Sequence, residues 1–150
     1  MRVEVDQSGK IEQTNQDTVL AFSNHIKRAV LIPRGEKRKL IKILRGRGMN
    51  GKIFYPRIFC SALFLLFKPH LSELNEIVID DEYTGKTRLV KNLLNNIAYR
   101  QNKPPISSKI SFDHVGKKSP AHILAWGARK DSKLVNEKVE ARQILQLIGK

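Results

Sequence analysis

The 150 residues of this sequence include one cysteine, one tryptophan and no long apolar run. A single cysteine can form neither an internal disulfide nor a cysteine zinc site, which excludes a disulfide-stapled secreted domain. The longest apolar stretch, Ile58 to Phe67, reaches about half the length that a membrane-spanning helix needs. The charged segment from Met1 to Asp6 is not typical of a secretion signal. We therefore expect a cytoplasmic protein without a membrane partner.

Acidic residues are half as common as basic ones. The chain has 28 Lys and Arg against 14 Asp and Glu, which gives a net charge of +14. A surplus of this size favours a polyanionic partner, because basic side chains attract phosphates and release their counterions. Nucleic acid, either DNA or RNA, is the leading expectation. A basic surface that serves only solvation is the alternative interpretation.

Hydrophobic periodicity predicts an α/β domain that spans residues 1–150, with a mixed five-stranded sheet flanked by helices. An antiparallel meander would be followed by two strands that are joined through helices. The predicted strands are 2–6, 17–22, 26–32, 76–80 and 106–115, and residues 11–14 could belong to the second one. The predicted helices are 33–47, 56–71, 86–100, 119–126 and 131–148, and 56–71 could instead be a buried strand.

Basic side chains are concentrated in a predicted helix and loop at residues 33–52. Leu40, Ile41 and Leu44 recur at helical spacing, and Lys and Arg cover the remaining positions. A glycine-rich loop follows at residues 46–52. We expect these side chains to contact nucleic acid, together with two lysines near residue 118. The predicted contacts are Arg34, Lys37, Arg38, Lys42, Arg45, Arg47, Lys52, Lys117 and Lys118.

Three consecutive acids follow the strand predicted at residues 76–80. Asp80, Asp81 and Glu82 come directly after three apolar β-formers, where the carboxyl ends of strands hold ligands in α/β sheets. Adjacent carboxylates repel one another in a chain this basic, and a bound metal ion would relieve that repulsion. A solvated turn is the simpler interpretation. His25, His70 and His114 show no metal-ligand spacing and are assigned no role.

The order of elements and three short motifs resemble the ribonuclease H-like superfamily, and RuvC-type resolvases in particular. The segment Val3-Glu4-Val5-Asp6 is similar to the family's first strand, which carries a metal-binding aspartate. The stretch from Ile77 to Glu82 is similar to its fourth strand with the second acid. Residues 117–125 (Lys-Lys-Ser-Pro-Ala-His-Ile-Leu-Ala) resemble its final helix, where a histidine can stand for the usual third acid.

This resemblance implies a Mg²⁺- or Mn²⁺-dependent nuclease that cleaves structured or branched nucleic acid, and it allows for a homodimer. It implies Asp6, Asp80 and His122 as catalytic residues and metal ligands, with Asp81 and Glu82 competing for the second position. Lys118 would contact the scissile phosphate.

The chain departs from the family at Ala125, where RuvC-type enzymes place another acid. Asp113 is the substitute that the sequence offers. Two other functions stay open: a non-catalytic nucleic-acid-binding module with the same fold, and a structural component of a ribonucleoprotein.

Overall fold

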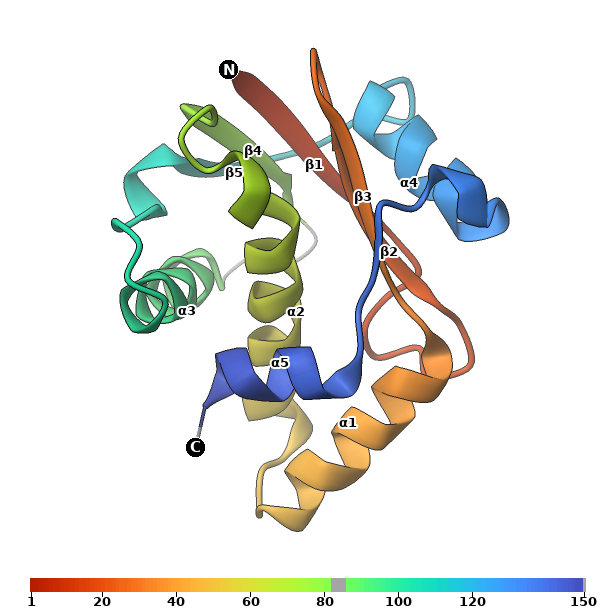
Figure 1. The fold of residues 1–150 in the computed structure, drawn as a ribbon, viewed down its shortest axis with the longest axis vertical. Helices are drawn as coiled ribbons and strands as arrows, with labels where there is room; N and C mark the ends of the chain where they lie inside the picture. The colour runs from red at the N-terminus through yellow and green to blue at the C-terminus, as the bar shows by residue number, and fades with distance from the viewer. Residues whose placement is uncertain (82–85, 150) are drawn as a thin grey trace.

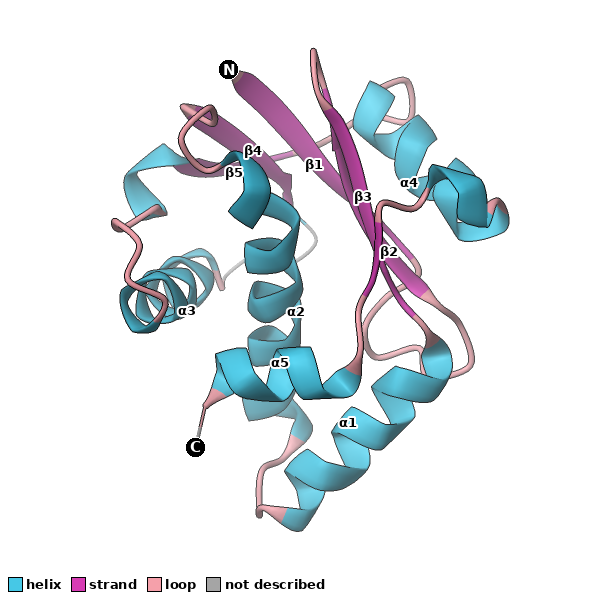
Figure 2. Ribbon diagram, viewed as in Figure 1, coloured by secondary structure: helices cyan, strands magenta, loops and turns pink. Residues whose placement is uncertain are grey.

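The computed structural model describes residues 1–81 and 86–149, which form a mixed six-stranded sheet flanked by helices (Figures 1 and 2). The strand order across the sheet is β5-β4-β1-β2-β3-β6. The strands are β1 (Arg2–Ser8), β2 (Thr18–Ser23), β3 (Lys27–Ile32), β4 (Glu76–Asp80), β5 (Ile110–Asp113) and β6 (Glu137–Lys138).

The directions of the strands bring several carboxyl ends to one edge of the sheet. β2 pairs antiparallel with both β1 and β3, whereas the β1–β4, β4–β5 and β3–β6 pairs are parallel. β1, β3, β4, β5 and β6 therefore run the same way. Their carboxyl ends, and the loops that follow them, lie along the same edge, which we call the carboxyl edge.

Helices cover the two faces of the sheet unequally. α1 (Arg34–Gly46), α2 (Gly51–Phe67), α3 (Thr87–Arg100) and α5 (Ala141–Ile148) lie on one face, and α4 (Pro120–Lys130) lies on the other (Figure 1). β2 shows the division, because successive strand residues point to opposite faces. Leu20 and Phe22 belong to the large core beside α2, while Val19 and Ala21 pack with Ala125 of α4.

The buried helix α2 begins five residues earlier than the sequence predicts. Phe54 is fully buried, so the apolar pattern already extends into the first turns of the helix. The backbone N–H groups of Ile53 and Phe54 donate to the carbonyl of Asn50 and close the first turn. Pro56 is tolerated within the helix, and Pro69 stands just beyond its end.

The predicted final helix at 131–148 is wrong in its first half. Residues Ser132–Leu134 form a single 3-10 turn, β6 follows, and α5 occupies only Ala141–Ile148. Asn136 explains the change: its backbone N–H donates to the carbonyl of Ala29, and its side-chain oxygen accepts from the Ala29 N–H. The segment thus adds a sixth strand to the exposed edge of β3. β4 has the predicted ends, and the other predicted elements are present with shifted ends, β5 being shorter than the strand predicted at 106–115.

Residues 11–14, which the sequence allows in the second strand, lie in the loop between β1 and β2. Across the described residues, the helices are too short or too polar to cross a membrane.

Candidate functional site

The parallel pairing of β1 with β4 sets Asp6 beside Asp80. The last register pair of these strands is Val5 with Ile79, and each aspartate is the next residue. Neighbouring strands lie roughly 4.8 Å apart, and in-register side chains of a parallel pair point to the same face. Asp6 and Asp80 also line one small cavity together with Phe59 of α2. The two acids that the sequence singles out are therefore neighbours at the carboxyl edge.

Asp6 is buried, and both of its carboxylate oxygens have partners. Oδ1 accepts from the backbone N–H of Gln7 at 2.8 Å, and Oδ2 lies 2.6 Å from Nδ1 of His122. An ionised carboxylate can only accept a hydrogen bond, so the proton of this contact sits on Nδ1 of the imidazole. That tautomer leaves Nε2 of His122 available to a metal ion or a substrate.

Ser119 fixes the start of α4 against β1 and so positions His122. Its side chain accepts from the backbone N–H of Ala121, as the sequence predicts for a helix N-cap. The same hydroxyl donates to Oε1 of Glu4 at 3.0 Å. Because Glu4 and Asp6 share a face of β1, the cap and the histidine meet consecutive side chains on that face.

A second group of potential metal ligands lies at the end of β4. Asp80, Asp81 and His114 each offer a ligand atom, and these atoms lie within 4.8 Å of one another. The spacing of His114 along the chain gives no hint of this role. The position of His114 directly after β5 could have indicated this role. The parallel β4–β5 register sets Asp113 opposite Asp80, so the next residue, His114, lies near Asp81.

One segment, residues 114–119, links the two groups. It leaves β5 at His114, and the backbone N–H of Val115 donates to Oδ1 of Asp80 at 2.9 Å. It ends at Ser119, from which α4 brings His122 to Asp6. Lys117 and Lys118 are exposed on this segment. The predicted phosphate contact at Lys118 therefore lies between the two histidines along the chain. Glu82 lies outside the described residues.

The prediction that Lys37 contacts nucleic acid is wrong, because this side chain lies inside the protein. Its side chain is fully buried, and its ammonium donates to the carbonyls of Lys10 and Gln13 and to the hydroxyl of Thr18. Burial lowers the pKa of Lys37 to about 8. Its three donors are thus engaged within the protein, and it holds the β1–β2 loop against α1 instead of facing a phosphate.

The other predicted basic contacts are exposed, and α1 begins at the carboxyl edge because it directly follows β3. Arg34, Arg38 and Lys42 are spaced four residues apart and form one stripe along α1. The backbone N–H of Arg34 donates to Oδ1 of Asp17, which ties the start of α1 to the β1–β2 loop. The exposed predicted contacts are Arg34, Arg38, Lys42, Arg45, Arg47, Lys52, Lys117 and Lys118.

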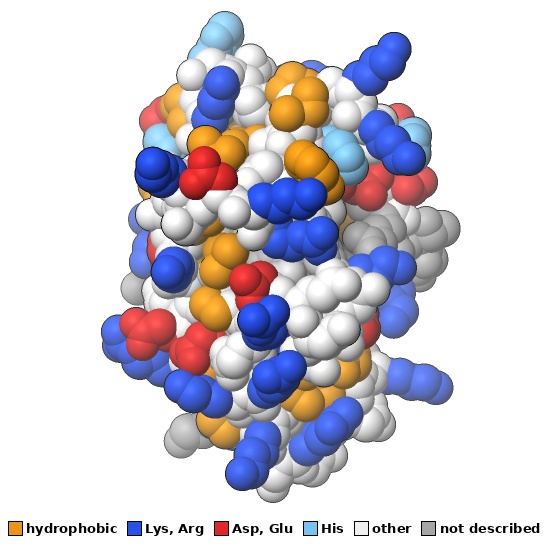
Figure 3. All heavy atoms as spheres, turned by 90° about the vertical axis from the view of Figure 1, so that its right-hand side faces the viewer, with side chains coloured by type: hydrophobic (Ala, Val, Ile, Leu, Met, Phe, Trp, Pro, Cys, Tyr) orange, Lys and Arg blue, Asp and Glu red, His pale blue; other side chains and the backbone are white. Residues whose placement is uncertain are grey.

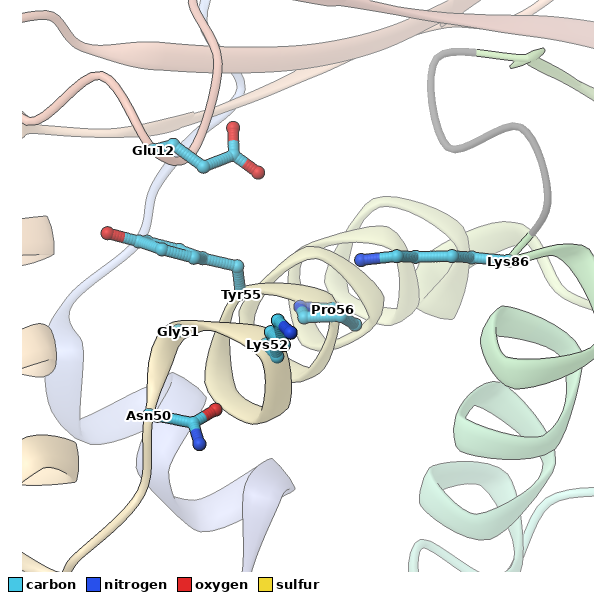
Figure 4. Close-up of a pocket in the computed structure, with 7 residues that line it drawn as sticks. All are labelled: Glu12, Asn50, Gly51, Lys52, Tyr55, Pro56 and Lys86. Atoms are coloured by element: carbon cyan, nitrogen blue, oxygen red, sulfur yellow. The ribbon is translucent and has the colours of Figure 1, made fainter.

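Lys52 lines an open hollow of about 650 Å³ between the β1–β2 loop, the start of α2 and the start of α3 (Figure 4). Lys86 reaches into this hollow from the α3 side, and Glu12 faces it from the β1–β2 loop. Tyr55 and Pro56 line it on α2. Phe59, one turn further along α2, lines the small cavity that contains Asp6 and Asp80. The hollow is therefore a basic neighbour of the carboxylates.

Cys60 takes no part in this site. It is buried in α2, its Sγ lies 3.7 Å from the carbonyl of Val90, and burial raises the pKa of its thiol. A thiolate nucleophile is thus disfavoured.

Searches with protein-family models, curated proteins and solved structures found no match to the chain.

Proposed function

We propose that the protein is a metal-dependent nuclease that cleaves phosphodiester bonds in structured or branched nucleic acid. The observation that carries the proposal is the placement of Asp6 and Asp80, each directly after the last register pair of two adjacent parallel strands and lining one cavity, with His122 bound to Asp6. Close carboxylates can hold the hard divalent cations that many phosphoryl-transfer sites use.

The order of β1 to β5 supports a ribonuclease H-like assignment. In that superfamily the first strand lies beside the fourth, each carries an acid, and a late helix brings a third ligand. The strand order β5-β4-β1-β2-β3 has the same neighbours. Asp6, Asp80 and His122 come from the corresponding elements, and β6 is an addition at the far edge.

The donor set fits Mn²⁺ well and Mg²⁺ acceptably. Carboxylate oxygens suit both ions, whereas imidazole nitrogen favours Mn²⁺. Asp80, Asp81 and His114 would hold the cation, with Asp6 and His122 beside them. Such a cation supplies an activated water and neutralises charge on the leaving oxygen. Lys118 would attract the substrate phosphate towards the carboxylates and offset their repulsion of it.

The basic surface supports nucleic acid as the substrate. The net charge of +14 leaves a large uncompensated positive potential. The exposed stripe on α1 and the hollow with Lys52 and Lys86 both adjoin the carboxyl edge. A phosphate backbone bound to these basic side chains would bring its scissile bond to the carboxyl edge, where Asp6 and Asp80 lie.

Cleavage assays with matched variants test this proposal. Four-way junctions, flaps, RNA–DNA hybrids and single strands would be incubated in Mn²⁺ or Mg²⁺ with wild type, Asp6→Asn and the control Glu73→Gln, an exposed position before β4. We expect cleavage by wild type and Glu73→Gln and none by Asp6→Asn, because the substitution removes a negative charge beside the cation and keeps the shape. Cleavage at equal rates in all three proteins would contradict the proposal.

A second candidate is a nucleic-acid-binding module without catalysis. The hydrogen bonds of the two aspartates favour this candidate, because both oxygens of Asp6 and Oδ1 of Asp80 already accept hydrogen bonds within the protein. Their role would then be to hold β1, α4 and the 114–119 segment together. Tight binding to the same substrates without cleavage under any metal condition would establish this alternative.

A further inference from the structure

The outer face of α4 carries exposed apolar side chains in a basic surrounding. Ile123 is 60% exposed, Trp126 is 50% exposed and Leu134 is 44% exposed. Ile123 and Trp126 are three residues apart and therefore share one side of the helix. Figure 3 views the molecule from the side on which α4 lies and shows hydrophobic side chains interspersed with Lys and Arg. We call Ile123, Trp126 and Leu134 the α4 patch.

Two specific contacts fix the side chains of the α4 patch. The ammonium of Lys130 lies 3.8 Å from the centroid of the Trp126 ring, a cation–π contact. Leu134 packs over Gly127, where even a Cβ atom would meet its methyl group at 3.3 Å. The missing side chain at Gly127 thus lets Leu134 lie close to the helix beside Trp126.

The positive charge around the α4 patch favours a negatively charged ligand. Lys130 and Lys133 flank it at one end, and Lys117 and Lys118 precede α4 at the other. Asp131 is the one acid between residues 117 and 135, and it accepts from the backbone N–H of Lys133. A second copy of the same basic face would be repelled. A ligand with both flat apolar faces and negative charge is attracted, and an unpaired nucleic-acid strand has both.

The patch is also continuous with the candidate site. His122, which is bound to Asp6, stands four residues before Trp126, which is just over one turn of helix or roughly 6 Å along its axis. We propose that the α4 patch is a stacking platform for unpaired bases, with Trp126 as the stacking residue and the flanking lysines contacting the adjacent phosphates. This inference rests on the proposed nucleic-acid function and assigns the substrate a single-stranded segment that leaves the site along α4.

Trp126 makes the test direct, because it is the one tryptophan in the chain. Its fluorescence would be titrated in EDTA, so that binding is measured without cleavage. The probes are a 20-nucleotide oligothymidylate, a blunt duplex of the same length, and heparin as a polyanion without bases. We expect strong quenching by the single strand and little by the duplex or heparin, since only an unpaired base can cover the indole.

Affinity measurements by fluorescence anisotropy of labelled probes complete the experiment. Trp126→Leu should weaken single-strand binding about tenfold and duplex binding less than twofold, because base–aromatic stacking is removed. Trp126→Phe should restore most of the affinity. The control Tyr99→Leu removes a more exposed aromatic ring, on α3, and should leave both affinities unchanged. Circular dichroism and urea unfolding verify that each variant is folded.

The outcomes separate this inference from the proposed function. Equal quenching by heparin, or unchanged single-strand affinity in Trp126→Leu, would overturn the platform and leave nucleic-acid binding in place. A wild-type dimer that Trp126→Leu converts to a monomer in sedimentation, with affinity unchanged, would make the patch a contact between two copies. Absence of binding to every probe would defeat both proposals.

Discussion

Nδ1 of His122 and Oδ2 of Asp6 lie 2.6 Å apart although 116 positions separate the two residues in the chain. The contact joins β1 to α4, the helix that covers the face of the sheet opposite to α1, α2, α3 and α5 (Figure 1). His122 is about one-third exposed, whereas the Asp6 side chain is buried at 6% exposure. The pair therefore links a rigid interior anchor to a partly accessible imidazole, which suits a role in positioning a ligand at the surface.

Replacing His122 by Ala should lower both stability and metal-dependent cleavage. Removal of the charge-assisted hydrogen bond would leave Oδ2 of Asp6 without its partner, so we expect a decrease of about 1.5–3 kcal/mol in the free energy of unfolding. Cleavage in Mn²⁺ should fall less than in Asp6→Asn if the imidazole is a peripheral ligand. Urea unfolding and initial cleavage rates measure the two effects.

The control for that variant is His25→Ala, in the exposed hairpin between β2 and β3. Its stability and its cleavage rate should match wild type. A stability decrease in His122→Ala no larger than in His25→Ala would show that the hydrogen bond to Asp6 contributes nothing measurable.

Metal binding should stabilise the protein through Asp80, Asp81 and His114. A ligand that binds only the folded state adds about 2.7 kcal/mol at a concentration 100-fold above its dissociation constant. We expect the Tm to rise with Mn²⁺ and to return to its starting value in EDTA. The double variant Asp81→Asn, His114→Ala should abolish this rise, as followed by thermal unfolding and Mn²⁺ electron paramagnetic resonance. A rise of the same size in the double variant would place the ion elsewhere.

Lys37 should act on stability and not on nucleic-acid binding. Lys37→Met leaves the carbonyls of Lys10 and Gln13 without this donor, and we expect a decrease of about 2–4 kcal/mol in the free energy of unfolding. Affinity for a duplex, measured on the folded variant by anisotropy, should stay within twofold of wild type. A large drop in affinity with unchanged stability would restore Lys37 as a phosphate contact.

The pH dependence of stability gives Lys37 a second signature. Burial lowers its pKa in the folded protein to about 8, against an ordinary value of 10.5. Between these values the unfolded chain binds more protons than the folded one, so the free energy of unfolding rises with pH over this interval. The contribution is complete above 10.5 and is lost as the pH falls through 8. Urea unfolding at pH values on either side of the folded-state pKa, about 7.5 and about 9.5, should show the rise in wild type and not in Lys37→Met.

The stripe on α1 should account for part of the salt dependence of binding. Replacing Arg34, Arg38 and Lys42 by Gln should weaken duplex binding and flatten the plot of log affinity against log salt. The slope should change by up to roughly 0.9 for each phosphate that the variant no longer binds. The control triple at Lys68, Lys91 and Lys103 removes the same formal charge from other parts of the surface. Equal effects of the two triples would show that net charge, and not α1, governs binding.

Local patterns in the sequence are sufficient for several elements. The strand Glu76–Asp80 is predicted with its observed ends, because three consecutive β-branched residues precede acids that stop it. The start of α4 follows from Ser119, a hydrogen-bonding cap, placed before Pro120 at the first helical position. The expectation that Lys37 contacts nucleic acid is wrong although a signal exists: Lys37 shares the face of Leu40, Ile41 and Leu44, the buried side of α1.

The sequence by itself determined the charge of +14, the acids on the first and fourth strands, and both ends of α1 and α3 to within one residue, since these depend on composition and on residues close along the chain. Tertiary structure alone decided which of these groups meet. The β1–β4 register set Asp6 beside Asp80, the chain after β5 carried His114 to Asp81, and the free edge of β3 converted residues 137–138 from predicted helix to strand. Each of these outcomes depends on backbone pairing between distant segments, which local periodicity does not encode.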